Sequence, residues 1–162
     1  MAGNLKGLPP SGHTITAHLS VRDGVKAVEF YQKAFGMELK GLHKTPDGKV
    51  MHAELKIGDS TIMVADEFPQ SPAPSPATLG GSAVVLNLYV EDVDALFNKA
   101  VAAGAKVLMP LANMFWGDRY GQIKDPFGHV WALGTHLEDV APEEMERRAN
   151  AFFAGMAKKP GH

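Results

Sequence analysis

Two stretches of the chain, 69 residues apart, repeat the same pattern, and this repeat limits the fold more than any other feature. Residues 18–23 read HLSVRD and residues 87–92 read NLYVED, so leucine, valine and aspartate coincide. In each copy an alternating segment, typical of a strand, leads into a helical stripe followed by a glycine, Gly36 or Gly104. Further alternating segments follow. We therefore predict an α+β fold of two strand-helix-strand-strand-strand (βαβββ) modules, packed as a pseudo-twofold pair.

The 162 residues are enough for a single domain, 1–162, that contains both modules. The first module is expected over 14–67 and the second over 83–137. Between them, 68–82 carries four prolines among serines and glycines, which excludes a regular helix or a central strand and predicts an extended linker or a surface loop. A C-terminal helix is expected over 138–159. Its apolar stripe predicts packing on its own domain or, alternatively, on a partner subunit.

Composition narrows the class of partner. The apolar fraction is 45%, the charged fraction 21% and the formal net charge −2, which gives no electrostatic footprint for nucleic acid or an anionic membrane. The absence of cysteine excludes disulfides, thiolate catalysis and cysteine-ligated zinc. The sequence contains no apolar run long enough to span a bilayer and no signal-peptide pattern. A cytoplasmic protein is expected.

Three separate stretches resemble one known superfamily. AVEFYQKAFGMEL, AELKIGDSTIMVADE and FWGDRYGQIKDPFGHVWALGTHLEDVAPEEMERR, with the repeat, resemble the vicinal oxygen chelate superfamily of glyoxalase I, bleomycin- and fosfomycin-resistance proteins and extradiol dioxygenases. They are most similar to its PhnB-like branch, and the resemblance covers residues 14–150. It implies two βαβββ modules (glyoxalase/bleomycin resistance-like) whose curved sheets enclose a ligand cavity. It also implies a homodimer with edge strands or the C-terminal helix at the interface.

The resemblance gives a meaning to the alternation of the first strand of each module. One face of each strand should lie against the helices and the other should line the cavity. The set expected to face the helices is Ile15, Ala17, Leu19, Val84, Leu86 and Leu88. The set expected to face the cavity is Thr16, His18, Ser20, Val85, Asn87 and Tyr89.

The metal positions of the superfamily do not carry metal ligands in this chain. Metal-dependent members hold a divalent ion with side chains from the first and last strands of each module. Strand register transfers those positions to Thr16 and Met63 in the first module, and to Val85 and Ala132 in the second. Hydroxyl, thioether and alkyl side chains are not the usual ligands of such ions. We therefore expect no metal cofactor, which argues against glyoxalase I and extradiol dioxygenase activity.

A different polar site is open to the first module. His18 shares the predicted cavity face, and His52 and Glu54 share one face of the segment VMHAELKI. Convergence of the three would give a two-histidine, one-carboxylate site for a divalent metal. His18 or Glu54 could instead act as a general acid or base. The favoured interpretation is simpler, with His18 in the cavity wall and the other two forming a polar pair.

The segment FWGDRYGQIKDPFGHVW is similar to the tryptophan-containing segment before the last hairpin of bleomycin-resistance proteins, where aromatic residues help to bind a planar, cationic drug. Trp116 and Tyr120 offer rigid ring faces for stacking, and Arg119 could alternatively bind a carboxylate or phosphate. Trp116 could also simply plug the cavity. The residues 125–128, DPFG, have the chemistry of a turn, and Trp131 is expected in the core beneath a helix.

These patterns favour a small-molecule-binding protein without the usual metal site. The alternative is an enzyme, a metal-dependent lyase or isomerase of the glyoxalase type, with a dioxygenase as the weaker alternative. The expected ligand-binding residues are Thr16, His18, His52, Glu54, Met63, Asn87, Tyr89, Trp116, Arg119 and Tyr120.

Overall fold

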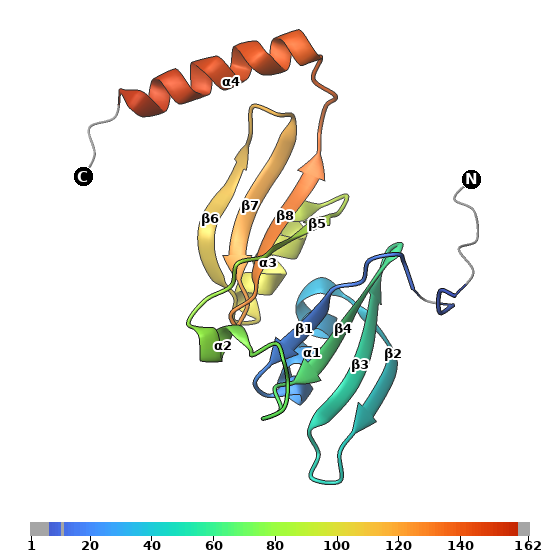
Figure 1. Cartoon of the computed structure of the whole chain (residues 1–162). Helices are drawn as coiled ribbons and strands as arrows, with labels where there is room; N and C mark the ends of the chain where they lie inside the picture. Colours follow the sequence, from blue (N-terminus) through green and yellow to red (C-terminus); the bar gives the residue numbers. More distant parts are fainter. Residues whose placement is uncertain (1–6, 11, 159–162) are drawn as a thin grey trace.

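The computed structural model of the chain describes residues 7–10 and 12–158 (Figure 1). The first module is a four-stranded sheet with one helix. Its elements are β1 (His18–Val21), α1 (Gly24–Phe35), β2 (Glu38–Lys44), β3 (Val50–Ile57) and β4 (Ser60–Asp66). The strand order is β1-β4-β3-β2, in which β1 runs parallel to β4 and the other pairs are antiparallel.

The second module has the same topology. Its elements are β5 (Val85–Tyr89), α3 (Val93–Ala102), β6 (Lys106–Asn113), β7 (Asp118–Lys124) and β8 (Val130–His136). The strand order is β5-β8-β7-β6. His18 lies opposite Met63 in the first sheet, and Asn87 lies opposite Ala132 in the second. Asn87 follows His18 by 69 residues and Ala132 follows Met63 by the same number, so the predicted α+β fold of two βαβββ modules is confirmed.

The first strand of each module is shorter than the alternation predicts. β1 begins at His18 rather than at residue 14, although the carbonyl of Ala17 still accepts a hydrogen bond from the N–H of Met63. Ile15 and Val84 therefore lie before the strands and are 90% and 61% exposed, so the expectation that they face the helices was wrong. Alternation gives the face of a residue but does not say where its partner strand ends.

The proline-rich segment contains one turn of helix, α2 (Pro76–Leu79), which the prolines were expected to exclude. Pro76 occupies the first turn of this helix, where its missing N–H costs nothing, and the hydroxyl of Ser75 accepts from the N–H of Thr78. Ser75 also donates to Glu67 at the end of β4. The segment is therefore fixed to the first module at this point.

The helices of the two modules pack against each other and share one core. Trp131 of β8 contacts Tyr31 and Phe35 of α1, with ring centroids 5.6 and 4.9 Å apart. The prediction that Trp131 lies in the core beneath a helix is confirmed. Because the helices lie on the shared side, the opposite face of each sheet, here called its open face, points away from the core (Figure 1).

Each module fixes its helix start with a side chain from its last strand. The carboxylate of Asp66 accepts hydrogen bonds from the N–H groups of Gly24 and Val50. At the equivalent place in the second module, the hydroxyl of Thr135 accepts from the N–H of Val93. The unsatisfied N–H groups of a helix start thus find an acceptor in both modules.

The C-terminal helix, α4 (Pro142–Ala157), crosses the far end of the second module (Figure 1). None of its residues is buried. Phe152 contacts Phe115, with ring centroids 5.1 Å apart, and Arg148 pairs with Glu138 of the preceding connection. Packing on its own domain, the favoured expectation, thus rests on contacts with the β6–β7 turn and with the connection that precedes the helix. Over residues 7–10 and 12–158, helices long and apolar enough to cross a membrane are absent.

Candidate functional site

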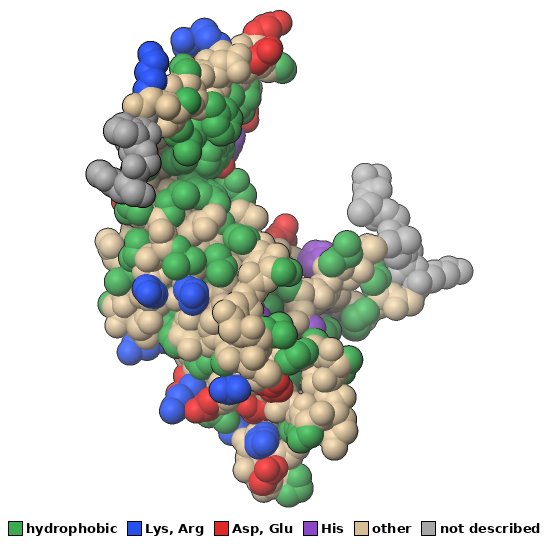
Figure 2. Space-filling model, turned by 60° about the vertical axis from the view of Figure 1, so that its left-hand side comes forward, with side chains coloured by type: hydrophobic (Ala, Val, Ile, Leu, Met, Phe, Trp, Pro, Cys, Tyr) green, Lys and Arg blue, Asp and Glu red, His purple; other side chains and the backbone are tan. Residues whose placement is uncertain are grey.

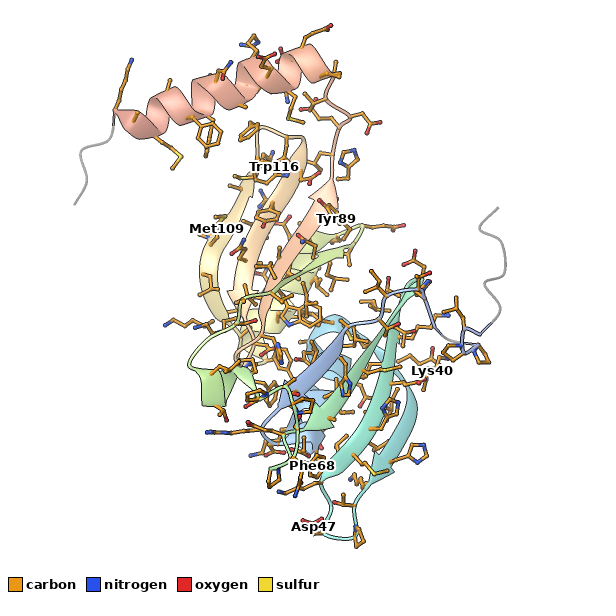
Figure 3. All side chains as sticks on the ribbon, in the orientation of Figure 1. Lys40, Asp47, Phe68, Tyr89, Met109 and Trp116 are labelled. Carbon is orange, nitrogen blue, oxygen red and sulfur yellow. The ribbon has the colours of Figure 1, made fainter. Side chains whose placement is uncertain are left out.

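The open face of the first sheet forms the floor of a pocket of about 430 Å³. His18 and Ser20 of β1 and Ala65 of β4 lie on the floor, and the start of the proline-rich segment, including Phe68, covers it (Figure 3). The complete lining is His18, Ser20, Met51, Ala65, Asp66, Phe68, Gln70, Ser71, Pro72 and Ala73. The linker is therefore a wall of this pocket as well as a connection between modules.

His18, His52 and Glu54 gather on this open face. The imidazole rings of His18 and His52 are 6.5 Å apart and edge-on, and His52 Nε2 lies 3.4 Å from Glu54 Oε1. Burial, with a smaller contribution from His52, lowers the pKa of His18, so its ring is a neutral donor or acceptor near pH 7. Met63 of β4 lies between these two strands, opposite His18 of β1 and Glu54 of β3.

Four residues stand at the positions that the resemblance assigns to metal ligands: Thr16, Met63, Val85 and Ala132. Met63 and Ala132 occupy equivalent places in β4 and β8, and Val85 begins β5. Thr16 lies two residues before β1. Among the residues that the structure describes, no three His, Cys, Asp or Glu side chains are arranged to hold a metal ion. The donor set of this part of the chain does not fit a divalent metal.

The open face of the second sheet carries aromatic and amide side chains. Asn87 and Tyr89 come from β5, and Tyr120 and Gln122 come from β7, where they lie opposite Gly134 and Ala132 of β8. Trp116 lies in the turn between β6 and β7 (Figure 3) and contacts Tyr120 edge-on, with ring centroids 5.3 Å apart. We call Tyr89, Trp116 and Tyr120 the aromatic wall. The structure therefore brings these three predicted residues together.

Arg119 is not part of this wall. It lies between Asp118 and Tyr120 in β7, and neighbouring residues of a strand point to opposite faces. Its guanidinium forms a two-pronged pair with Asp94 of α3, at 2.6 and 2.7 Å, and a bond of 3.2 Å to Asn113. This charge is committed to the helix side of the sheet rather than directed toward a ligand.

A buried carboxylate holds the aromatic wall in place. Asp118 is 4% exposed. Its Oδ2 accepts hydrogen bonds from the Tyr89 hydroxyl, at 2.7 Å, and from Trp116 Nε1, at 2.9 Å. Its Oδ1 lies 2.8 Å from Nδ1 of His136, whose Nε2 lies 2.8 Å from Oδ1 of Asp139. Sequence reasoning missed Asp118 and His136 because Asp118 is the first residue of β7 and His136 the last residue of β8, and the alternation does not show where these strands begin and end.

The charges of this network support one another. Burial alone would raise the pKa of Asp118, but the hydrogen bonds from His136, Tyr89 and Trp116 together lower it. The bonds to Asp118 and then Asp139 raise the pKa of His136. Both ring nitrogens can donate only in the protonated imidazole. The arrangement therefore favours an ionised Asp118 beside a protonated His136.

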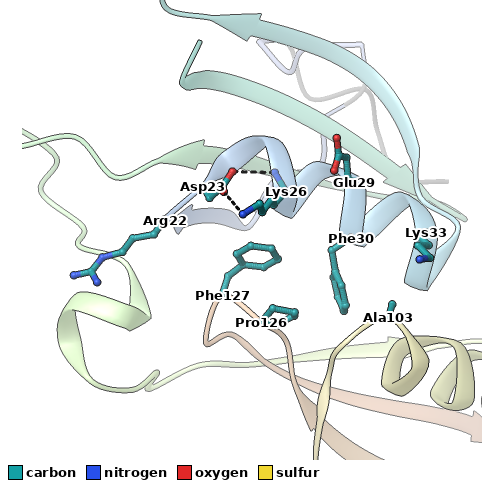
Figure 4. A pocket seen from close by; sticks show the side chains of 9 residues that line it. All are labelled: Arg22, Asp23, Lys26, Glu29, Phe30, Lys33, Ala103, Pro126 and Phe127. Carbon is teal, nitrogen blue, oxygen red and sulfur yellow. Dashed lines mark hydrogen bonds and ion pairs between the residues drawn. The ribbon is translucent and has the colours of Figure 1, made fainter. Parts of the chain in front are cut away.

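A second hollow, of about 520 Å³, lies on the helix side of the molecule (Figure 4). Phe30 and Phe127 line it, and the pair between Asp23 and Lys26, 3.2 Å apart, crosses its rim. None of the predicted site residues lines this hollow. It is separate from the open faces of both sheets.

Comparisons with known proteins agree with this architecture. Residues 12–133 match the Glyoxalase/Bleomycin resistance protein/Dioxygenase superfamily. An uncharacterized Mycobacterium tuberculosis protein, Rv0887c, is 43% identical over 135 residues, which cover 82% of this chain and 79% of that protein. TioX from Micromonospora sp. ML1 is 29% identical, with a TM-score of 0.61, over 78% of this chain and all of its own. A PhnB protein from Bacillus cereus, 21% identical over 76% of this chain and 99% of its own, shares the fold with a TM-score of 0.61.

Proposed function

This chain belongs to the glyoxalase/bleomycin resistance protein/dioxygenase superfamily, and we propose that it binds a planar aromatic or amphipathic small molecule without a metal ion. The observation that carries the proposal is the aromatic wall on an open sheet face. Tyr89 is 57% exposed although its hydroxyl is held by a buried carboxylate. A large ring kept rigid and exposed offers binding area at little entropic cost.

The chemistry of the metal positions supports a binder over a metal enzyme. A thioether, two alkyl side chains and one hydroxyl stand at Met63, Val85, Ala132 and Thr16. These groups make the centre of the site apolar, which suits contact with a hydrocarbon or ring surface. Asn87 and Gln122 are polar but carry no charge, so they can orient a ligand without requiring a charged one.

We propose that the site closes in a homodimer. The two open faces of one chain point away from its core, so neither covers the other. A flank of apolar side chains is also exposed, on β6 and α4 (Figure 2). It consists of side chains from both faces of the edge strand β6 and from α4: Val107, Leu108, Met109, Phe152, Phe153 and Met156. Patches of this kind mark interaction sites, and a twofold axis would bring the open face of each first sheet to the second sheet of the other copy.

The competing function is a lyase or isomerase that uses His18, His52 and Glu54. The 6.5 Å approach of the two imidazoles on one pocket floor favours it. His18, with its lowered pKa, is suited to accept a proton from a bound ligand near neutral pH. The two functions differ in whether the bound molecule is consumed.

Titration with proflavine, a planar tricyclic cation, tests the binding function. We expect saturable quenching of tryptophan fluorescence with no change in the proflavine absorption that would indicate turnover. Trp116→Phe should abolish the quenching, whereas the buried Trp131 should contribute little. Quenching that rises linearly with proflavine, and equally in Trp116→Phe, would contradict the proposal. Conversion of the bound molecule, lost in His18→Ala, would favour the enzyme.

A further inference from the structure

We infer that Asp118 is a positioning residue that makes the second sheet selective for flat ring systems. The inference rests on the proposed ligand site. The Asp118 carboxylate is shared by donors from three separate elements: Tyr89 at the end of β5, Trp116 in the β6–β7 turn, and His136 at the end of β8. One buried acceptor therefore fixes the hydroxyl end of the Tyr89 ring and the indole edge of Trp116 relative to β7.

The network also decides which part of each ring a ligand can meet. The Tyr89 hydroxyl and Trp116 Nε1 both donate inward to Oδ2 of Asp118. The third ring, Tyr120, already accepts a hydrogen bond of 2.8 Å from Gln122 Nε2. The donors of Tyr89 and Trp116 are thus used within the protein, so these two rings offer their faces and edges to a ligand. Such a surface gains from stacking and apolar burial rather than from new hydrogen bonds.

Shape should therefore count for more than polarity in this site. A flat molecule can lie against rings whose angles are fixed, whereas a puckered molecule of the same size touches them at fewer points. If Asp118 were lost, Tyr89 and Trp116 would be free to rotate, and the difference between flat and puckered ligands would diminish. The protein would still present apolar area, so that binding itself would persist.

The ring orientation can be measured without any ligand. The chain has two tryptophans, and each indole N–H donates to a carboxylate: Trp116 to Asp118 and Trp131 to Asp125. In Asp118→Leu, we expect the Trp116 indole N–H to shift in its nitrogen-15 spectrum and to exchange with solvent about tenfold faster or more. Trp131 should not change and is the internal control. An unchanged Trp116 signal would overturn the inference.

The conservative variant separates positioning from charge. The side-chain oxygen of Asp118→Asn can still accept from Tyr89 and Trp116, so this variant should keep the wild-type Trp116 signal. Tyr89→Phe frees one ring only and serves if Asp118→Leu does not fold. Its preference for flat over puckered ligands should fall between that of the wild type and that of a protein in which neither Tyr89 nor Trp116 is held. If Tyr89→Phe kept the wild-type preference for flat over puckered ligands, that result would count against a positioning role for Asp118.

Selectivity is tested by calorimetry with two amines of equal charge and skeleton, 1-naphthylmethylamine and its saturated decahydronaphthyl counterpart. Wild-type protein and Asp118→Asn should bind the flat amine about tenfold more tightly. Asp118→Leu should bind both within about threefold. If wild-type protein binds neither amine, the proposed ligand site is refuted and the selectivity with it. If Asp118→Leu keeps the wild-type preference, the site stands and the positioning role is overturned.

Discussion

The hydroxyl of Tyr31 in α1 donates a hydrogen bond of 2.6 Å to Oδ2 of Asp125, in the turn between β7 and β8, and so joins the two modules. Asp125 also accepts from Trp131 Nε1 and from the N–H groups of Phe127 and His129. Tyr31 is 0% and Asp125 3% exposed. The turn at residues 125–128 thus has the structural role that its composition indicates, and it also anchors the contact between modules.

Removing Asp125 should cost much more stability than removing the Tyr31 hydroxyl. Tyr31→Phe deletes one of four donors, and we expect a loss of about 1–2 kcal/mol in the free energy of unfolding. Asp125→Ala removes the acceptor of all four donors, and the Tyr31 hydroxyl and Trp131 Nε1 are buried, so we expect about 3 kcal/mol or more. Urea denaturation measures both. Asp47→Ala, in an exposed turn, is the control and should stay within about 0.5 kcal/mol of the wild type.

Gly117 should not tolerate a side chain. Its φ is +100°, and a Cβ there would lie 2.3 Å from the backbone oxygen of Glu138. Gly117→Ala must therefore push the β6–β7 turn away from the connection to α4, and we expect a loss of about 2 kcal/mol or more. Gly155→Ala is the matched control, because its Cβ would meet open space within a helix. It should raise the thermal midpoint slightly. Equal effects of the two changes would contradict this account.

Stability should depend on pH through His136 and Asp118. The raised pKa of His136 gives a contribution that is full below about pH 6.5 and is lost as the pH rises through the higher folded-state pKa. The lowered pKa of Asp118 gives a contribution that is present above about pH 4 and is lost as the pH falls through the folded-state value. The network should therefore contribute most to the free energy of unfolding at pH values between the acidic loss of the Asp118 contribution and the alkaline loss of the His136 contribution.

Proton NMR titration of the His136 ring checks this prediction. Asp118→Asn should lower the pKa of His136 more than Asp139→Asn, because Asp118 is the larger cause of the shift and lies buried beside the ring. The Asp139 side chain is fully exposed, and water screens its effect. A larger decrease of the His136 pKa in Asp139→Asn than in Asp118→Asn would show that the buried carboxylate does not control the pKa of His136.

Metal content should be low and independent of His18. Protein purified without a histidine tag and dialysed against zinc, nickel or manganese should hold much less than one equivalent. His18→Ala should leave that amount unchanged, because the described residues offer no set of three ligands. Stoichiometric metal that disappears in His18→Ala would instead support the lyase or isomerase.

The apolar flank should control oligomeric state. We expect a dimer in sedimentation velocity and a monomer for the double change Phe153→Ser and Met156→Ser, whose side chains are 60% and 57% exposed. Arg147→Ala, which removes a side chain that pairs with Glu144 along the same helix, is the control and should remain dimeric. A wild-type protein that is monomeric at every concentration would refute the proposed dimer.

The sequence predicted the modules and their register well, because both depend on periodicity. His18 and Asn87 are separated by the same number of residues as their strand partners, Met63 and Ala132. Trp131 could be placed in the core because it alternates with Ala132. These relationships follow from the pleat of a strand, which is local information.

The remaining part of the site could not be read in this way, because it depends on where strands end. Asp118 is the first residue of β7 and His136 the last of β8, and they meet only because these ends pair. Local hydrophobicity does not determine such an end. Arg119 shows the opposite error: it was grouped with Tyr120 by proximity in sequence, although adjacent strand residues cannot share a face.

The matching helix-start contacts of Asp66 and Thr135 have a consequence for how this chain can change. The two modules share this backbone geometry although different residues serve it. The open faces differ in the same way: His18 and Met63 on one correspond to Asn87 and Ala132 on the other. Substitutions on the open face of one sheet can therefore change the ligand chemistry of that module while the other module keeps its own.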